Sequence, residues 1–317
     1  MAERVDVSNP EGWEVARNYV GLLGPIPSSF SSTIRTLVSD GEKLNESYSP
    51  KSKSLALRLA RSPSLIGSLE RVAREFRPSE TPSDFTVQAL PAIFKPSELA
   101  MLIAFIYLYR KAKKISDQDE WQYINAPLVR RAELALAVGV AIPSVGISPS
   151  LMVAGAELIG MATIHAHDKP GFKDYRRFLK SKGEVTDGAY ELGRWGCTSS
   201  QIGGIVFQTA GFGIATAEAF VHSMHEADIT ARDEATHKAR QRFLVAKDWI
   251  QSLDQSGKVP DRVHDARYYP LKDAQEQLLR QAAKVQKSGE ICGWLSLAKD
   301  EAVAALEQEE GGEAGGK

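Results

Sequence analysis

Two of the six histidines in the chain lie one residue apart and are followed directly by an aspartate. These residues are His165, His167 and Asp168, in the stretch MATIHAHDKPG (161–171). Imidazole nitrogens and carboxylate oxygens are common ligands of zinc, and a metal held there would activate water for hydrolysis. The alternative is structural. The segment then ends a helix, where cationic side chains gain about 0.3–1 kcal/mol, and DKPG forms the turn that follows.

A second group of potential ligands lies in the stretch IATAEAFVHSMH (214–225). Glu218, His222 and His225 are spaced i, i+4 and i+7, so they share one face of a helix. One helix can present a carboxylate and two imidazoles to a metal in this way, and the alternative is a solvated or interface face. A metal site built from both groups requires the two helices to meet, because a catalytic metal needs several ligands around one point.

A third candidate is a basic helix in the stretch GFKDYRRFLK (171–180). Its cationic side chains line one side of the predicted helix, while Phe172 and Leu179 line another. The cationic residues are Lys173, Arg176, Arg177 and Lys180. One interpretation is the charged outer face of an amphipathic helix. The other is a docking surface for an acidic partner or a phosphorylated ligand.

Signatures of nucleophilic catalysis and of phosphate loops are missing from the sequence. Cys197 follows a glycine at the start of a predicted helix, where the dipole lowers a thiol pKa. No histidine is near it in sequence, so a small packing residue is favoured. The sequence contains neither a GxSxG nucleophile motif nor a GxxxxGK loop.

Composition indicates a globular protein of the reducing cytoplasm. Of the 317 residues, 43% are hydrophobic and 25% are charged, and the net charge is −1 with a pI of about 6.6. This balance does not favour nucleic acid or an anionic membrane as a partner. Two distant cysteines form no disulfide framework. The apolar run 99–109 is too short to span a bilayer and predicts a buried core helix.

Helical signals dominate the chain, so we expect an all-α protein. Ser148 and Pro149 predict the cap and first residue of one helix. Thr198 and Gln201 form a capping box at the start of another, just after Gly196 ends the preceding helix. Apolar stripes at helical spacing follow. They comprise Ile214, Ala217, Val221 and Met224; Ala239, Phe243, Ala246 and Ile250; and Leu271, Leu278, Ala282 and Val285.

Turn signals and composition suggest four segments. We expect a helical leader over 1–19, a main helical domain over 20–251, and a connector with a helical C-terminal extension over 252–308. The glycine- and glutamate-rich tail over 309–317 is predicted to be disordered.

The stretches HDKPGFKDYRRFLKSKG (167–183) and ELGRWGCTSSQIGGIVF (191–207) resemble the HDOD domain, a bacterial relative of the HD phosphohydrolases that is associated with signal output. The match is a helix that ends in a tryptophan and a short turn, followed by the helix of the next packing layer. Looser similarity in LLGPIPSSFSSTIRTLVSD (22–40) and KSLALRLARSPSLIG (53–67) extends the resemblance over residues 20 to 225. It implies a multi-helix HD-like fold.

The sequence departs from the HD phosphohydrolases where that family binds metal. Glu157 and Leu158 stand in place of the His-Asp pair, and the helix after Trp121 contains no histidine. HDOD domains generally lack part of this ligand set, so the loss agrees with the resemblance. The resemblance therefore implies a protein without hydrolase activity and without a cofactor.

We expect a non-catalytic module of bacterial signal transduction that binds a protein partner or a small anionic ligand in the cytoplasm. A homodimer is compatible with the sequence. The alternative is a metal-dependent phosphohydrolase with relocated ligands, built from the six His, Asp and Glu residues of the first two groups. A third possibility is a scaffold whose only chemistry is association through its small-residue helices.

Overall fold

The computed structural model describes residues 6–225, 234–261, 268–288 and 293–295. These residues form 14 α-helices and no strand, which confirms the all-α prediction. The helices are α1 (Pro10–Val20), α2 (Ser28–Lys43), α3 (Pro50–Leu59), α4 (Pro63–Phe76), α5 (Leu90–Ile93), α6 (Pro96–Ile115), α7 (Gln118–Ala141), α8 (Ile147–His167), α9 (Lys169–Lys182), α10 (Gly188–Trp195), α11 (Ser199–Phe207), α12 (Ile214–Met224), α13 (Glu234–Ser256) and α14 (Lys272–Ser288). Shorter turns are η1 (Gly21–Leu23), η2 (Val87–Ala89) and η3 (Gln208–Phe212).

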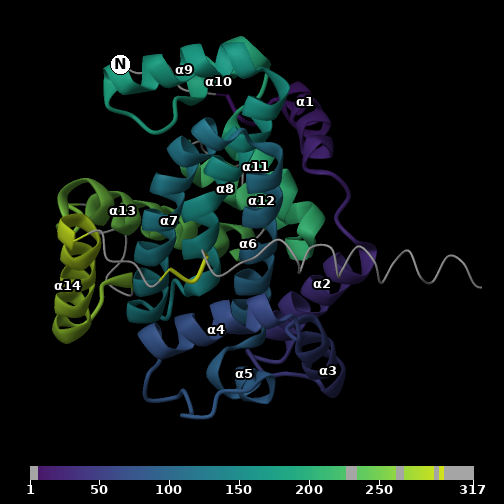
Figure 1. Cartoon of the computed structure of the whole chain (residues 1–317), viewed down its shortest axis with the longest axis vertical. Coiled ribbons are helices and arrows are strands. Elements are labelled where there is room, and N and C mark those ends of the chain that lie inside the picture. Colours follow the sequence, from purple (N-terminus) through teal and green to yellow (C-terminus); the bar gives the residue numbers. More distant parts are fainter. Residues whose placement is uncertain (1–5, 226–233, 262–267, 289–292, 296–317) are drawn as a thin grey trace, which may run out of the picture.

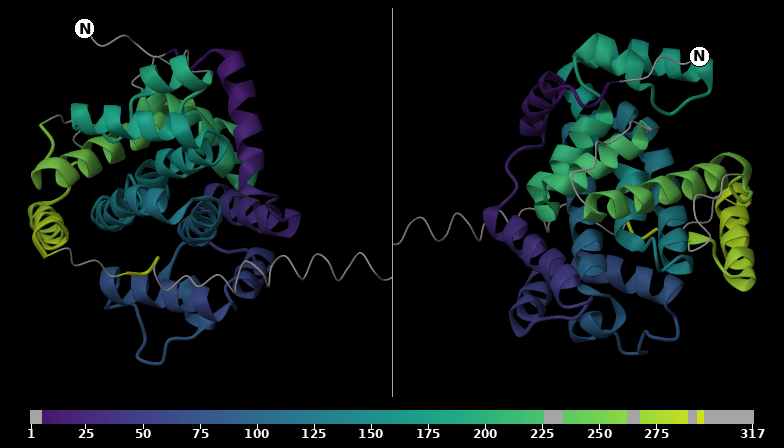
Figure 2. Two further views of the ribbon diagram at one scale, coloured as in Figure 1. Left: turned by 45° about the horizontal axis from the view of Figure 1, so that its top comes forward. Right: turned by 180° about the vertical axis from the view of Figure 1, so that it is seen from behind.

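The long helices α6, α7 and α8 form the centre of the molecule, together with α11 and α12 (Figure 1). Helices α3, α4 and α5 cover one end, and α9 and α10 cover the other (Figure 1). The views in Figure 2 agree that α13 and α14 lie along one flank, opposite α1. Residues far apart in sequence therefore meet around α8.

Helix α8 is the core of the fold, and glycine lets its neighbour approach it closely. A Cβ atom on Gly160 would lie 2.1 Å from the carbonyl oxygen of Ser199. A Cβ atom on Gly203 of α11 would lie 2.1 Å from the carbonyl oxygen of Ala156. The two backbones thus pack directly on each other, as the small residues predict. By length and apolar composition α8 would also span a membrane, but it is almost entirely buried within the fold.

A tryptophan near the end of the described chain is part of this core. Trp294 is fully buried, and its ring lies 5.8 Å from that of Phe105 on α6. The hydroxyl of Ser68 on α4 donates a hydrogen bond to the Trp294 carbonyl at 2.6 Å. The residues around Trp294 therefore join α4 to α6.

Two helix ends are formed as predicted, and one is not. Gly196 ends α10 with a left-handed φ of 73°, and the capping box of Thr198 and Gln201 opens α11. The prediction that Ser148 caps α8 is wrong, because α8 begins two residues earlier than predicted, at Ile147, with Gly146 as its cap. The Ser148 hydroxyl instead donates to the carbonyl of Ser97 on α6 at 2.9 Å.

The predicted apolar stripes are mostly buried, with Met224 and Ala239 half-buried, and they are exposed at two helix starts. Ile214 is 53% exposed and Leu271 is 84% exposed, so their placement in the core is wrong. Ile214 is the first residue of α12 and Leu271 precedes α14, where neighbouring helices no longer cover the stripe. Helix α13 extends to Ser256, past the predicted start of the connector. The predicted disordered tail, 309–317, lies outside the described residues.

Candidate functional site

The first group of potential metal ligands forms the end of one helix and the start of the next. His165 is fully buried against Phe172, and burial lowers the pKa of its imidazole. The ring of His167 packs edge-on to that of Tyr19, with centroids 4.7 Å apart. The Asp168 carboxylate caps α9 by accepting a hydrogen bond from the backbone N–H of Gly171 at 2.9 Å. The three side chains therefore point to different neighbours.

The second group lies on α12 and is separate from the first. His222 lies in the field of Glu218, whereas Nε2 of His225 lies 2.7 Å from Oγ of Ser200 on α11. The described residues hold no group of three or more His, Cys, Asp or Glu side chains arranged to bind a metal. The convergence that the relocated-ligand alternative requires is therefore not found among its six residues.

The pairing of Ser200 with His225 has the geometry of a nucleophile and its base, and the sequence gives no sign of it. Ser200 is nevertheless 1% exposed, and its hydroxyl also lies 2.9 Å from Oγ1 of Thr198. Burial lowers the pKa of His225 to about 4, with Lys247 adding to the effect. The pair thus joins the end of α12 to the start of α11, inside the protein.

A buried acid stands where the resemblance places the metal ligands of HD phosphohydrolases. Burial raises the pKa of Glu157, and the positive charges of Arg131 and Lys247 oppose that rise. Its neighbour Glu191 accepts hydrogen bonds from the Tyr175 hydroxyl at 2.6 Å and from Ser199. Among the described residues, no third His, Cys, Asp or Glu side chain joins these two acids in a group that could hold a metal ion.

The basic helix α9 is engaged partly by its own protein. Arg176 donates to the buried carboxylate of Glu120 at 2.8 Å and lies over the ring of Tyr123. Arg177 pairs with Asp174 on its own helix and is 79% exposed. Lys173 and Lys180 are also exposed. Arg176 therefore fastens α9 to α7, and three cations remain on the outer face.

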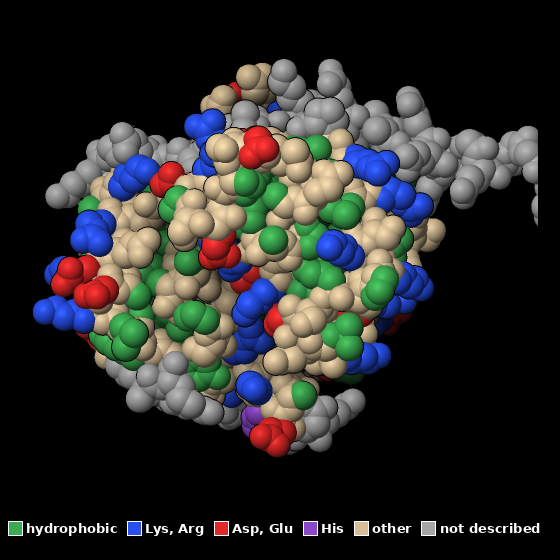
Figure 3. Space-filling view, turned by 90° about the horizontal axis from the view of Figure 1, so that it is seen from below, with side chains coloured by type: hydrophobic (Ala, Val, Ile, Leu, Met, Phe, Trp, Pro, Cys, Tyr) green, Lys and Arg blue, Asp and Glu red, His purple; other side chains and the backbone are tan. Residues whose placement is uncertain are grey.

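The described part of the face that carries α3, α4 and α5 shows no extended region of one charge. Lys and Arg side chains alternate there with Asp and Glu, and hydrophobic side chains are scattered between them (Figure 3). On this face, a broad electrostatic surface for nucleic acid or an anionic membrane is not visible.

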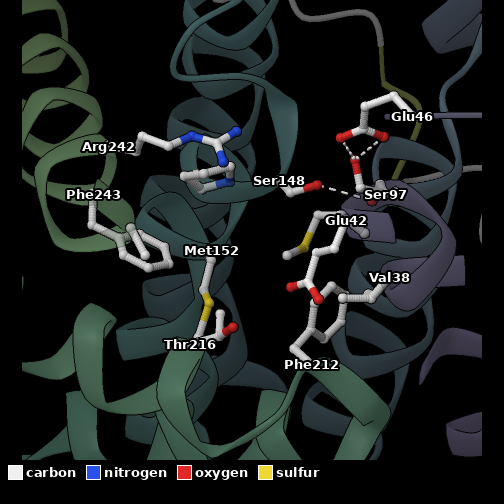
Figure 4. A pocket seen from close by; sticks show the side chains of 14 residues that line it. Val38, Glu42, Glu46, Ser97, Ser148, Met152, Phe212, Thr216, Arg242 and Phe243 are labelled. Carbon is white, nitrogen blue, oxygen red and sulfur yellow. Dashed lines mark hydrogen bonds between the residues drawn. The ribbon is translucent and has the colours of Figure 1, made fainter. Parts of the chain in front are cut away.

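A cavity of about 260 Å³ lies where the ends of α2, α6, α8 and α12 meet α13 (Figure 4). Arg242 and Phe243 of α13 form one side, and Glu42 and Phe212 lie across the space from them (Figure 4). Met152 of α8 lies between the two sides (Figure 4). The described lining residues include neither histidine nor cysteine, so the cavity is equipped for binding more than for acid–base or nucleophilic chemistry.

One nitrogen of the Arg242 guanidinium is hydrogen-bonded to the protein, and the two terminal amino groups face the cavity. Its Nε donates to the Val145 carbonyl at 2.9 Å, just before the start of α8. Among the described residues, no hydrogen bond or ion pair reaches its two terminal amino groups. Burial lowers the pKa of Arg242, the field of Glu46 opposes this, and the ordinary value is high enough to keep it charged.

The backbone next to Arg242 is shaped to leave room for it. Gly146 has a left-handed φ of 82°, and a Cβ atom there would lie 3.2 Å from Nη2 of Arg242. Helix α8 begins at Ile147, so the positive end of its dipole lies on the same side of the cavity as the guanidinium. This side of the cavity is therefore suited to an anionic group.

Apolar side chains form the body of the cavity. Met101 of α6 and Met152 of α8 contribute flexible thioethers, and Val38, Phe212 and Phe243 contribute branched and aromatic surface. Methionine adapts to ligands of different shapes. A small molecule with an apolar body and an anionic end matches this lining.

The sequence analysis did not predict the cavity or its charged residues. Arg242 was hidden in the apolar stripe of Ala239 and Phe243, where its adjacency to a buried aromatic residue is the only signal. Glu46 lies in an irregular turn, and nothing in its neighbourhood predicts that it meets α6. No protein-family model matches the chain, and comparisons with curated proteins and with solved structures find no match.

Proposed function

We propose that this protein is a non-catalytic ligand-binding module that accepts a small anionic molecule in the cavity at Arg242. In this proposal the chain acts in bacterial signal transduction, in the manner of the HDOD domains that it resembles, and the occupied state is read by a protein partner. The anionic ligand binds inside the fold at α13, and the outer face of α9 has no part in binding it.

The observation that carries the proposal is the open guanidinium of Arg242. A mostly buried arginine normally uses its planar fork on a carboxylate or phosphate. Here the Val145 carbonyl engages only Nε, and the fork faces a cavity with apolar walls. A bound carboxylate supplies the missing charge-assisted hydrogen bonds, while the apolar part of the ligand displaces water from the methionines.

The cavity has the size of a small-molecule site. Its volume of about 260 Å³ lies just below the range of about 300–1,000 Å³ that is usual for ligand pockets. It therefore suits a small molecule whose anionic group lies at Arg242.

Titration calorimetry with sodium hexanoate tests this proposal on the full chain. We expect R242Q to weaken binding at least about tenfold, because hydrogen bonds between charged groups contribute about 1.5–3 kcal/mol. The matched control is R177Q, which removes an exposed cation from α9 and should leave the affinity unchanged. Loss of binding in R177Q but not in R242Q would place the ligand on α9, and no binding of hexanoate to the unaltered protein would contradict the proposal.

A further inference from the structure

The cavity carries opposite charges on its two sides. The Arg242 guanidinium projects from α13, and the carboxylates of Glu42 and Glu46 lie across the space from it (Figure 4). No ion pair joins Arg242 to either glutamate among the described contacts, although the field of Glu46 acts on the guanidinium. The protein thus keeps its own charges apart over an apolar space.

The negative side is held in place as firmly as the positive one. The Ser97 hydroxyl lies 2.8 Å from each carboxylate oxygen of Glu46. Gly41 makes room for this contact, since a Cβ atom there would lie 3.0 Å from the Glu46 carboxylate. Glu46 has a left-handed φ of 62°, as does Asn45 at 49°. Such a conformation is unfavourable for residues other than glycine, and the turn keeps it in order to direct the Glu46 carboxylate at Ser97.

Glu42 completes the negative side at the mouth of the cavity. It belongs to the last turn of α2 and is exposed, and its carboxylate points into the space above Phe212 (Figure 4). Two carboxylates against one guanidinium give the cavity a net negative charge. A ligand that is only an anion satisfies Arg242 but brings no partner for Glu42 and Glu46. A ligand with an ammonium at its far end satisfies both sides.

We propose that the cavity selects zwitterions whose cationic and anionic groups lie at opposite ends of an apolar body, the class of ω-amino acids. This inference rests on the proposed function and adds a second recognition element, the carboxylates of Glu42 and Glu46, which bind the cationic end of the ligand. The ligand's carboxylate binds Arg242, its ammonium binds between Glu42 and Glu46, and its methylene groups lie against Met101 and Met152.

Calorimetry with three matched probes tests the selection: 6-aminohexanoate, hexanoate and 1-aminohexane. They share one apolar body and differ only in their charged ends. We expect 6-aminohexanoate to bind at least about tenfold more tightly than either singly charged probe. E46Q keeps an acceptor for the Ser97 hydroxyl, and E42Q changes an exposed side chain, so both variants should fold. Each should weaken 6-aminohexanoate and leave hexanoate as tight or tighter.

The outcomes separate this inference from the proposed function. If hexanoate binds as tightly as 6-aminohexanoate and both glutamate variants leave the two affinities unchanged, the zwitterion selection is overturned and the anionic site stands. If neither hexanoate nor 6-aminohexanoate binds, or if R242Q leaves the affinities for both molecules unchanged, the proposed function and this inference fail together. If L-leucine, whose two charges share one carbon, binds more tightly than 6-aminohexanoate, the end-to-end arrangement of charges is overturned.

Discussion

Two buried titratable side chains, Glu191 and His225, contact consecutive serines at the start of α11. We predict that they change the free energy of unfolding with pH in opposite directions. Glu191 accepts hydrogen bonds from Ser199, and His225 lies 2.7 Å from Oγ of Ser200. Burial raises the pKa of Glu191 from 4.5 to about 7. Burial also lowers the pKa of His225 from 6.5 to about 4.

For Glu191, the direction of the pH dependence follows from the ionised carboxylate, which burial in the folded state disfavours. Below pH 4.5 the carboxyl is protonated in both the folded and the unfolded chain, and its burial carries no charge penalty. As the pH rises through 7, the unfolded chain ionises first and the folded state loses stability. Over this range of about 2.5 pH units, at about 1.36 kcal/mol per unit, the loss reaches about 3 kcal/mol.

The sign for His225 is the reverse. Above pH 6.5 the imidazole is neutral in both states, so its burial carries no charge penalty. As the pH falls from 6.5 to 4, the imidazole is protonated in the unfolded chain but stays neutral in the folded chain. The free energy of unfolding therefore falls by about 3 kcal/mol. Between pH 4.5 and 6.5 the two contributions offset each other in the unaltered protein.

Urea unfolding followed by circular dichroism, at intervals between pH 4.5 and 7, separates the two contributions. The free energy of unfolding of E191Q minus that of the unaltered protein should rise by about 3 kcal/mol across this range. For H225Q the corresponding difference should fall by most of about 3 kcal/mol by pH 6.5. Comparing differences over pH removes any constant cost of the substitutions. A difference for E191Q that stays constant would show that the hydrogen bonds from Tyr175 and Ser199 outweigh burial, and would refute the reasoning.

Three further outcomes follow from contacts in the fold. Gly160→Ala should lower the free energy of urea unfolding by at least about 2 kcal/mol, because its Cβ atom meets a carbonyl oxygen of α11. Gly193→Ala, an exposed helical control with open space around it, should raise it by about 0.5–1 kcal/mol. Arg176→Gln should cost about 1–3 kcal/mol in thermal or urea unfolding because it strips a buried carboxylate of its partner, whereas R177Q should stay within about 0.5 kcal/mol. Gly146→Ala should cost about 1–2 kcal/mol through its left-handed backbone and weaken hexanoate binding in calorimetry by displacing the guanidinium; unchanged binding would contradict the role of that glycine.

Helix type and several helix ends could be predicted because their signals are local. The capping box of Thr198 and Gln201 and the left-handed stop at Gly196 each act within four residues, so no knowledge of the rest of the fold is needed. Ser148 failed as a predicted cap because α8 already begins at Ile147, after the positive-φ residue Gly146, so that Ser148 lies within the first turn of the helix. Leu271 failed because a periodic pattern does not show where the helix itself begins.

The candidate site could not be predicted, because tertiary packing assembles it. Glu46, Ser97 and Arg242 come from three separate segments, and each reads alone as an ordinary surface or cap residue. The histidines show the opposite case, because the sequence left a metal site open there as the alternative to helix-end and surface roles. Their spacing on one helix is compatible with metal binding, but the rotation and contacts of α8 and α12 direct them to separate partners. Spacing fixes which side chains share a face, whereas the neighbouring helices decide what that face meets.

The contacts of Trp294 determine when the core can be completed during synthesis of the chain. The hydrogen bond between Ser68 and Trp294 spans 226 residues of chain. At about 5–20 residues per second, α4 leaves the ribosome about 10–45 s before its partner is made. During that interval the apolar surface around Phe105 lacks the indole that covers it, and it is open to chaperones and to other nascent chains. Completion of the core thus waits for the synthesis of Trp294, and a chain truncated before residue 294 lacks the indole that covers Phe105.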